Sequence, residues 1–334
     1  MAEPHVFSTR DIPIPDQQEA WRSWHGAIAE VSFPEQGSAE AGFAAESRIW
    51  LFDGMALARV RAPALRVVRS ALHTRRDPAD HWIVTIGMAA THLQLACETF
   101  TVQAGVPFLA SLAEPCVSER VRDERLHLYL SRDRFASLAS VLDGLRGPAP
   151  GAFSALFVRY LLLIEEALPT LPDADAARLP GAIASMLTSA IELAPRDDTM
   201  PRLSDHSVMA RVRSAVRRRI ASVSLGPKSL CRDVGISRSR LYRLLEGKGG
   251  VMRYIQQQRL RACYADLANP ADTRPIAVIA ERHGFSDPSS FSRAFRREFS
   301  LTPSDVRNGL DKAAFERESR GCLPASLHEH LRGL

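Results

Sequence analysis

Two short segments in the second half of the chain have the residue types and spacing to contact a polyanion. Each holds three arginines within six residues: Arg238, Arg240 and Arg243 in the first, and Arg293, Arg296 and Arg297 in the second. A guanidinium group is a planar fork of N–H donors that pairs with phosphates and with the edge of guanine. These side chains therefore indicate contact with nucleic acid.

Charge is unevenly distributed along the chain of 334 residues, whose net charge is +5. From Ser207 onward there are 24 basic and 12 acidic residues, whereas Met1–His206 contains 19 basic and 26 acidic residues. Every basic residue of the acidic part is also an arginine, so we interpret the preference for arginine over lysine mainly as genome composition. We expect only the basic part to face a polyanion.

The arginine-rich segments lie within two copies of a near-repeat, Ser229–Glu246 and Ile276–Phe299. Each copy reads as a short helix, a glycine, an apolar residue, a serine and a second helix. Gly235 and Gly284 stand where a tight turn between helices needs a positive φ. The spacing is typical of a helix-turn-helix, in which the second helix enters the major groove of DNA.

Capping and core residues support these helices. Ser237 is predicted to cap the second helix of the first copy, and Asp287 or Ser286 that of the second copy, with Pro288 at the first helical position. Apolar residues at helical spacing predict a small core in each copy: Leu230, Val234, Ile236, Leu241, Leu244 and Leu245, then Ile276, Ile279, Ala280, Phe285, Phe291, Phe295 and Phe299. One copy alone is also compatible with an ordinary helical hairpin, but two copies in a basic domain favour DNA binding.

The part before the repeat is predicted to contain a β barrel or sandwich at about 48–130. Trp82–Ile86 is an apolar run rich in β-branched residues, and His92–Leu95 and Leu126–Leu130 alternate between apolar and polar residues. Turn residues separate these runs, as expected for short antiparallel strands. Residues 1–30 show no clean period.

A break at 147–151 is followed by two predicted amphipathic helices within 153–193. The pair either forms a dimerisation surface or covers the barrel, and both interpretations stay open. We place the first domain at 1–194, a polar linker at 195–207, and a helical domain at 208–310 with helix-turn-helix units at 227–248 and 275–298. Residues 311–334 are assigned as a tail.

The segment Gly284–Arg307, GFSDPSSFSRAFRREFSLTPSDVR, resembles the signature of AraC/XylS-type bacterial transcriptional regulators. The resemblance covers about 211–310, with Val306 where an aromatic residue is common. It implies two helix-turn-helix units joined by a long helix, which corresponds to Val251–Leu267. The N-terminal half is similar, more weakly, to a cupin-like ligand-binding domain of this family at Arg59–Ser70 and Thr99–Gly105. The implied fold class is α+β with two domains: a cupin-like β barrel with a helical pair, then an all-α domain.

The resemblance also implies residue roles, which we carry over position by position. Residues expected to read DNA bases are Ser239, Tyr242, Arg243, Ser289, Ser290 and Arg293. Arginines flanking this face are expected to bind phosphates: Arg238, Arg240, Arg296 and Arg297. The two arginines among the base readers suit guanine best, because an arginine fork matches its O6 and N7 acceptors. The two units are expected to address successive major-groove segments roughly 10 bp apart.

Three functions remain open: an effector-responsive regulator, in this family most often an activator; a ligand-independent DNA-binding regulator whose N-terminal domain only assembles; and a metalloenzyme on the barrel. The expected partners are double-stranded DNA, RNA polymerase, a small effector of unknown identity and a second copy of the chain. Candidate effector contacts are Trp50, Arg59, Trp82 and His92.

No enzyme motif appears, and the histidines of the β region are isolated, so we expect neither catalysis nor a metal or other cofactor. His328–His330 are interpreted as an exposed, frayed terminus. Five widely spaced cysteines, Cys97, Cys116, Cys231, Cys263 and Cys322, indicate isolated thiols.

The chain offers no candidate for membrane insertion. The longest apolar run, Ala155–Leu163, is interrupted by Arg159 and is shorter than the roughly 20 residues of a membrane span. The first residues, MAEPHVFSTRD, do not resemble a signal peptide. We therefore expect a cytoplasmic protein.

Overall fold

The structure is a computed structural model that describes residues 3–34, 42–77, 79–95, 98–143, 145–149, 151–192, 203–222, 224–269, 272–309, 326–332 and 334. The chain divides into two compact units. The N-terminal unit comprises Met1–Thr74, Ala79–Met200 and Glu318–Leu334. The second unit, which contains the segment expected to bind DNA and is named the DNA-binding unit for that expectation, comprises Arg75–Pro78 and Pro201–Arg317. Most of the predicted linker, most of the predicted tail, Cys97 and Cys322 lie outside the described residues. No helix in the described part of the chain is long and apolar enough to cross a membrane.

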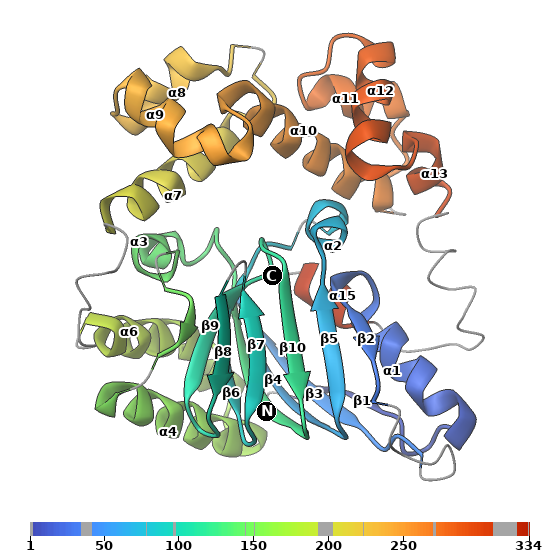
Figure 1. Cartoon of the computed structure of the whole chain (residues 1–334), viewed down its shortest axis with the longest axis vertical. Coiled ribbons are helices and arrows are strands. Elements are labelled where there is room, and N and C mark those ends of the chain that lie inside the picture. The colour runs from blue at the N-terminus through green and yellow to red at the C-terminus, as the bar shows by residue number, and fades with distance from the viewer. Residues whose placement is uncertain are drawn as a thin grey trace. The chain divides into compact units, whose positions relative to one another are not determined.

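Two antiparallel sheets form the centre of the N-terminal unit (Figure 1). The larger sheet has the order β1 (His5–Ser8), β3 (Glu46–Phe52), β4 (Met55–Ala62), β11 (Asp123–Leu130), β6 (Trp82–Gly87), β9 (Pro107–Ser111) and β12 (Gly147–Pro148). The smaller sheet has the order β2 (Glu30–Ser32), β5 (Leu65–Arg69), β10 (Cys116–Arg120), β7 (Thr91–Leu95) and β8 (Glu98–Val102). The predicted β sandwich is therefore confirmed.

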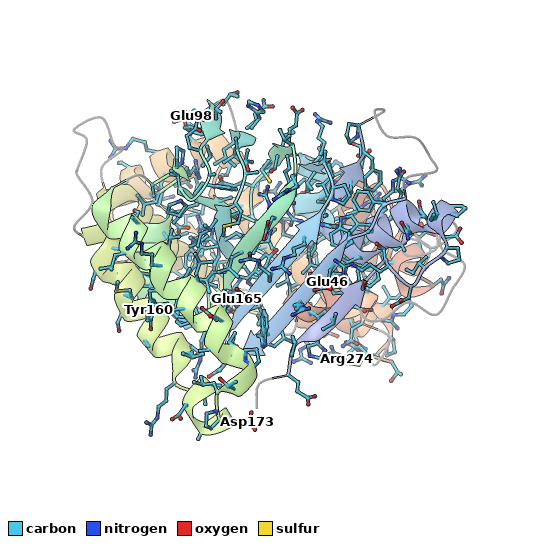
Figure 2. The ribbon with its side chains drawn as sticks, turned by 90° about the horizontal axis from the view of Figure 1, so that it is seen from below. Glu46, Glu98, Tyr160, Glu165, Asp173 and Arg274 are labelled. Atoms are coloured by element: carbon cyan, nitrogen blue, oxygen red, sulfur yellow. The ribbon has the colours of Figure 1, made fainter. Side chains whose placement is uncertain are left out.

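The two faces of the larger sheet have different neighbours. Tyr129 of β11 lies in one core cluster with Val67 of β5, so this face packs on the smaller sheet. The opposite face meets helix α4 (Ala152–Ala167), because Arg59 Nη1 of β4 lies 3.6 Å from Glu165 Oε2. Leu126 is paired with Arg59 across the strands and shares this face. Figure 2 shows α4 lying over the sheet, with Glu165 on the helix.

Helices α4 and α6 (Leu179–Glu192) pack side by side over the larger sheet, as the predicted helical pair (Figure 2). Leu161 of α4 and Ile183 of α6 are fully buried. Leu156, which the apolar period places on the buried stripe of α4, is 50% exposed. Other members of the predicted stripe, Phe157, Leu161, Ile164 and Leu168, are buried, so only the assignment of Leu156 is wrong.

The β region extends beyond the predicted range of 48–130. Strands β1 and β2 precede it and β12 follows it, and each has four residues or fewer. Alternation is not detectable over so short a stretch. Helix α1 (Gln17–His25) lies between β1 and β2 in the chain, and its Trp21 and Trp24 are buried in the same core as Tyr129.

The DNA-binding unit is helical throughout its described residues. Its helices are α7 (Leu203–Arg218), α8 (Pro227–Val234), α9 (Arg238–Leu245), α10 (Val251–Ala268), α11 (Ile276–Arg282), α12 (Pro288–Phe299) and α13 (Pro303–Arg307). Helix α10 serves two cores: Ile255 packs with α7, α8 and α9, whereas Leu260 packs with α11, α12 and α13. The predicted pair of units on a shared central helix is confirmed.

The end of the predicted tail is part of the N-terminal unit. Residues Leu327–Arg332 form helix α15 beside α1 (Figure 1). Leu331 is fully buried, and its carbonyl oxygen accepts a hydrogen bond of 2.8 Å from His81 Nε2. The His330 ring lies 4.5 Å from the ring of His5. The interpretation of His328–His330 as an exposed, frayed terminus is therefore wrong.

Candidate nucleic-acid interface

The turn between α8 and α9 is built on Gly235, which has φ +69° and ψ +43°. The amides of Gly235 and Ile236 both donate to Cys231 O, at 2.9 and 3.1 Å, and close the end of α8. Ile236 then packs against the first core. Ser237 Oγ accepts the Arg240 amide at 3.3 Å and caps α9. The glycine and the cap predicted from sequence are both confirmed.

The turn between α11 and α12 repeats this arrangement at Gly284, which has φ +81°. The Phe285 amide donates to Ala280 O at 3.0 Å, and the Phe285 ring lies 5.1 Å from that of Phe291. Asp287, rather than Ser286, caps α12, because its carboxylate accepts the amides of Ser289 and Ser290 at 3.2 and 2.8 Å. Hydrogen bonds from the Ser290 side chain and backbone lower the pKa of Asp287 below its ordinary value.

Both second helices bury one face and expose the other. Leu241 and Leu245 of α9, and Phe291, Phe295 and Phe299 of α12, are buried. The predicted base-reading residues, Ser239, Tyr242, Arg243, Ser289, Ser290 and Arg293, are all exposed. Of the predicted phosphate contacts, Arg238, Arg296 and Arg297 are exposed and Arg240 is half-buried.

Local contacts orient two of the exposed arginines. The Arg238 guanidinium lies 5.9 Å from the ring centroid of Tyr242, within the range of a cation–π contact. Arg293 Nη2 donates to Ser290 Oγ at 3.4 Å, one turn earlier on α12. Both helices thus present arginine forks beside hydroxyl groups, which is the chemistry that binds DNA phosphates and base edges.

Side chains at the end of α10 also contact the second helix-turn-helix. Asp266 Oδ2 accepts from His283 Nε2 at 2.9 Å and pairs with Arg274 Nη2 at 3.1 Å. Arg274 also pairs with Asp272, and this hydrogen bond lowers the pKa of Asp272. These contacts hold α11, and therefore the turn at Gly284, against the central helix.

Three of the four predicted effector contacts, Trp50, Arg59 and Trp82, share one face of the larger sheet, whereas the fourth lies on the other sheet. Trp50 and Arg59 lie on the face of the larger sheet that α4 covers, and Arg59 Nη2 is paired with Glu124 at 2.9 Å. Trp82 donates to Asp143 Oδ1 at 2.9 Å. His92 is exposed on β7 of the other sheet. Within the described residues, no group of three His, Cys, Asp or Glu side chains is placed to hold a metal ion.

Sequence reasoning missed one residue of this unit, Arg259 of α10. Its guanidinium donates to Ile220 O and Ser222 O, before α8, and to Gly284 O, in the second turn. The sequence shows Arg259 only as one residue of the expected central helix, because its partners are backbone carbonyls that carry no signal in the sequence.

Comparisons with known proteins agree with this geometry. A family profile described as a helix-turn-helix domain matches residues 230–309. The chain is 28% identical over 163 residues to the Msm operon regulatory protein of Streptococcus mutans, which covers 48% of this chain and 58% of that protein. It is 38% identical over 76 residues to the HTH-type transcriptional activator RhaS of Escherichia coli, which covers 23% of this chain and 27% of that protein. The matched part of the chain thus spans 58% of the length of the first relative and 27% of the length of the second.

A likeness to a solved structure extends across both units. The crystal structure of the AraC-like transcriptional activator CuxR has a TM-score of 0.55 and 28% identity, and covers 78% of this chain and 96% of that chain. The fold and the site together define a two-domain protein with a β sandwich and a double helix-turn-helix domain. The chain therefore contains a helix-turn-helix domain, and as a whole it is similar to an AraC-like transcriptional activator.

Proposed function

We propose that this protein is a sequence-specific activator of transcription that reads two successive segments of the major groove. The observation that carries the proposal is the pair of capped helices α9 and α12, which bury their apolar faces and expose arginine and hydroxyl side chains. The major groove is wide enough to admit an α-helix. Activation, with RNA polymerase as the partner and the cytoplasm as the location, follows from the family and from the activators among the relatives.

The exposed residues divide into two roles. Base reading is assigned to Ser239, Tyr242, Arg243, Ser289, Ser290 and Arg293, which lie on the outer faces of α9 and α12. Phosphate binding is assigned to Arg238, Arg240, Arg296 and Arg297, which flank these faces. Phosphate contacts position a protein on DNA, whereas contacts with base edges select the sequence.

The test begins with selection of preferred sequences from random DNA by the full chain, followed by fluorescence anisotropy with the selected operator. Arg293→Ala should relax specificity at one base position, where a good arginine–guanine pair is worth about 1–3 kcal/mol. Arg296→Ala should weaken binding to all sequences alike and make the salt dependence shallower, because one fewer phosphate is neutralised. Failure of the chain to enrich any sequence would refute the proposed function.

We infer further that the N-terminal unit binds a small effector between its sheets. Support comes from polar side chains on the inner faces: Thr85 Oγ1 lies 2.9 Å from His127 Nδ1 in the larger sheet, and Ser118 of β10 is buried in the smaller sheet. A ligand that binds the native state raises the melting midpoint. A thermal-shift screen of small metabolites, followed by operator binding with each hit, tests this function. If regulation is independent of a ligand, no compound should change both the melting midpoint and the affinity for the operator.

The same unit offers a surface for a homodimer on the outside of its helical pair. Leu156 and Leu163 of α4 are 50% and 64% exposed and lie seven residues apart on one side of the helix, with the exposed Arg159 between them. Among residues 179–190 of α6, the exposed positions are small and uncharged: Gly181, Ala182, Ser185 and Ser189. Apolar patches of this kind mark interaction sites. A double Leu156→Glu, Leu163→Glu variant should shift sedimentation from dimer to monomer, and an unchanged dimer would place the interface elsewhere.

A further inference from the structure

Arg259 lies near the middle of α10, between the residues that pack in the two cores of the DNA-binding unit. Three of its N–H groups reach backbone carbonyls on two sides of the helix. Nε donates to Ile220 O at 3.1 Å and Nη2 to Ser222 O at 2.7 Å, while Nη1 donates to Gly284 O at 3.3 Å. The guanidinium therefore connects the segment that leads into α8 with the turn that leads into α12.

The first of these connections continues to α8. Arg219, next to Ile220, pairs with Asp233 Oδ2 of α8 at 2.8 Å and donates to Ser224 Oγ at 3.2 Å. This hydrogen bond from Arg219 lowers the pKa of Asp233 below its ordinary value. A polar path thus runs from α8 through the segment at Ile220 to Arg259.

The second connection depends on the absence of a side chain at Gly284. A Cβ built on this residue would lie 2.8 Å from Arg259 Cζ, closer than real Cβ contacts. Gly284 therefore has two functions: its positive φ forms the turn, and its bare Cα lets the guanidinium reach the turn carbonyl. Gly235 forms the equivalent first turn, yet a Cβ there would meet its nearest atom, Arg211 Nη2, only at 3.4 Å.

We propose that Arg259 is a positioning residue that sets the placement of α12 relative to α9, and so determines which spacing of the two major-groove segments the protein accepts. The inference rests on the proposed DNA-binding function. Each core packs on its own half of α10, and the guanidinium joins the two halves through hydrogen bonds. Lysine cannot replace it, because an ammonium group is a single point and not a planar fork that reaches both sides.

The experiment measures binding of the full chain to its selected operator and to operators in which one base pair is inserted or deleted between the two segments. One base pair moves a segment by about 3.4 Å and rotates it by roughly a tenth of a turn. The wild type should lose most of its affinity on either change. Arg259→Met should bind the original operator about tenfold more weakly, as expected for losing hydrogen bonds to a charged group, and should lose much less on changing the spacing.

Two matched controls separate positioning from charge and from turn strain. Arg253→Met removes the same charge from an exposed position of α10 and should weaken all spacings equally. Gly284→Ala and Gly235→Ala both place a side chain at positive φ, but only Gly284→Ala displaces Arg259. If Arg259→Met fails to fold, the glycine pair carries the test: Gly284→Ala should broaden the accepted spacing, and Gly235→Ala should not.

The outcomes are distinct. Broadened spacing in Arg259→Met and in Gly284→Ala, with unchanged preference in both controls, supports the positioning role. Equal loss at all spacings for Arg259→Met would show that the residue contributes only charge or stability, and would overturn the proposal while leaving the DNA-binding function intact. If the wild type selects no operator at all, the proposed function fails, and this proposal fails with it.

Discussion

Truncation of Leu331 to alanine should destabilise the N-terminal unit, although this residue follows the DNA-binding unit in the chain. Leu331 is fully buried among core residues that include Trp21, Trp24 and Ile28. Replacing a fully buried leucine by alanine costs about 2–5 kcal/mol. Because α15 has only six residues and can open locally, we expect the lower part of this range, about 2–3 kcal/mol.

Differential scanning calorimetry of the full chain measures this effect. For a unit of about 200 residues, each kcal/mol lowers the melting midpoint by roughly 2–4 °C, so Leu331→Ala should lower one transition by about 4–12 °C. Leu260→Ala, in the second core of the DNA-binding unit, identifies the other transition. Val121→Ala, at a 72% exposed position of the N-terminal unit, should change the midpoint by less than about 2 °C.

The refuting results are equally specific. A shift of less than about 2 °C for Leu331→Ala would show that α15 does not contribute to the N-terminal core. A shift of the transition that Leu260→Ala identifies, with the other unchanged, would assign α15 to the DNA-binding unit. Deleting residues 326–334 should reproduce the effect of Leu331→Ala, and a silent deletion would contradict the packing.

Three further predictions concern the DNA-binding unit. Gly235→Ala should reduce the free energy of unfolding by about 1–2 kcal/mol in urea titrations, because alanine is strained at φ +69°; an unchanged midpoint would contradict a rigid turn. The lowered pKa of Asp287 means that its stabilising contribution is complete above its ordinary pKa of 3.8 and is lost as the pH falls further. Asp287→Asn, which still caps, should therefore flatten part of the acid dependence of the melting midpoint, and a profile identical to the wild type would argue against this cap. Cys263 is fully buried and its pKa is raised chiefly by burial, whereas Cys231 is half-buried, so peptide mapping after thiol labelling should show Cys231 modified first.

Much of the DNA-binding unit was predictable because its signals are local. Gly235 and Gly284 are glycines because the turn needs a positive φ, and Ser237 and Asp287 cap the helix that begins at the next residue. Each of these features depends on neighbours within a few residues of chain. The charge of the unit and the exposed arginines of α9 and α12 follow from composition and helical period in the same way.

The N-terminal unit was predictable only in part, because its signals depend on length. Strands of five residues or more, such as β6 and β11, show apolar runs or alternation and were placed correctly. The short strands β1 and β2 acquire their structure from pairing with β3 and β5, which lie far away in the sequence. No local pattern reveals such pairing, so the first residues showed no clean period.

By itself, the sequence determined the two helix-turn-helix units, their caps and their exposed arginines, since hydrogen bonds and helical periodicity within one unit specify them. Only the tertiary structure decided that Arg259 connects the two helix-turn-helix units through the carbonyls of Ile220, Ser222 and Gly284. It also decided that α15 completes the core of the N-terminal unit. Carbonyl acceptors are identical in every residue, and the burial of Leu331 depends on side chains some 300 positions earlier in the chain. Neither relation leaves a pattern that a reading along the chain can detect.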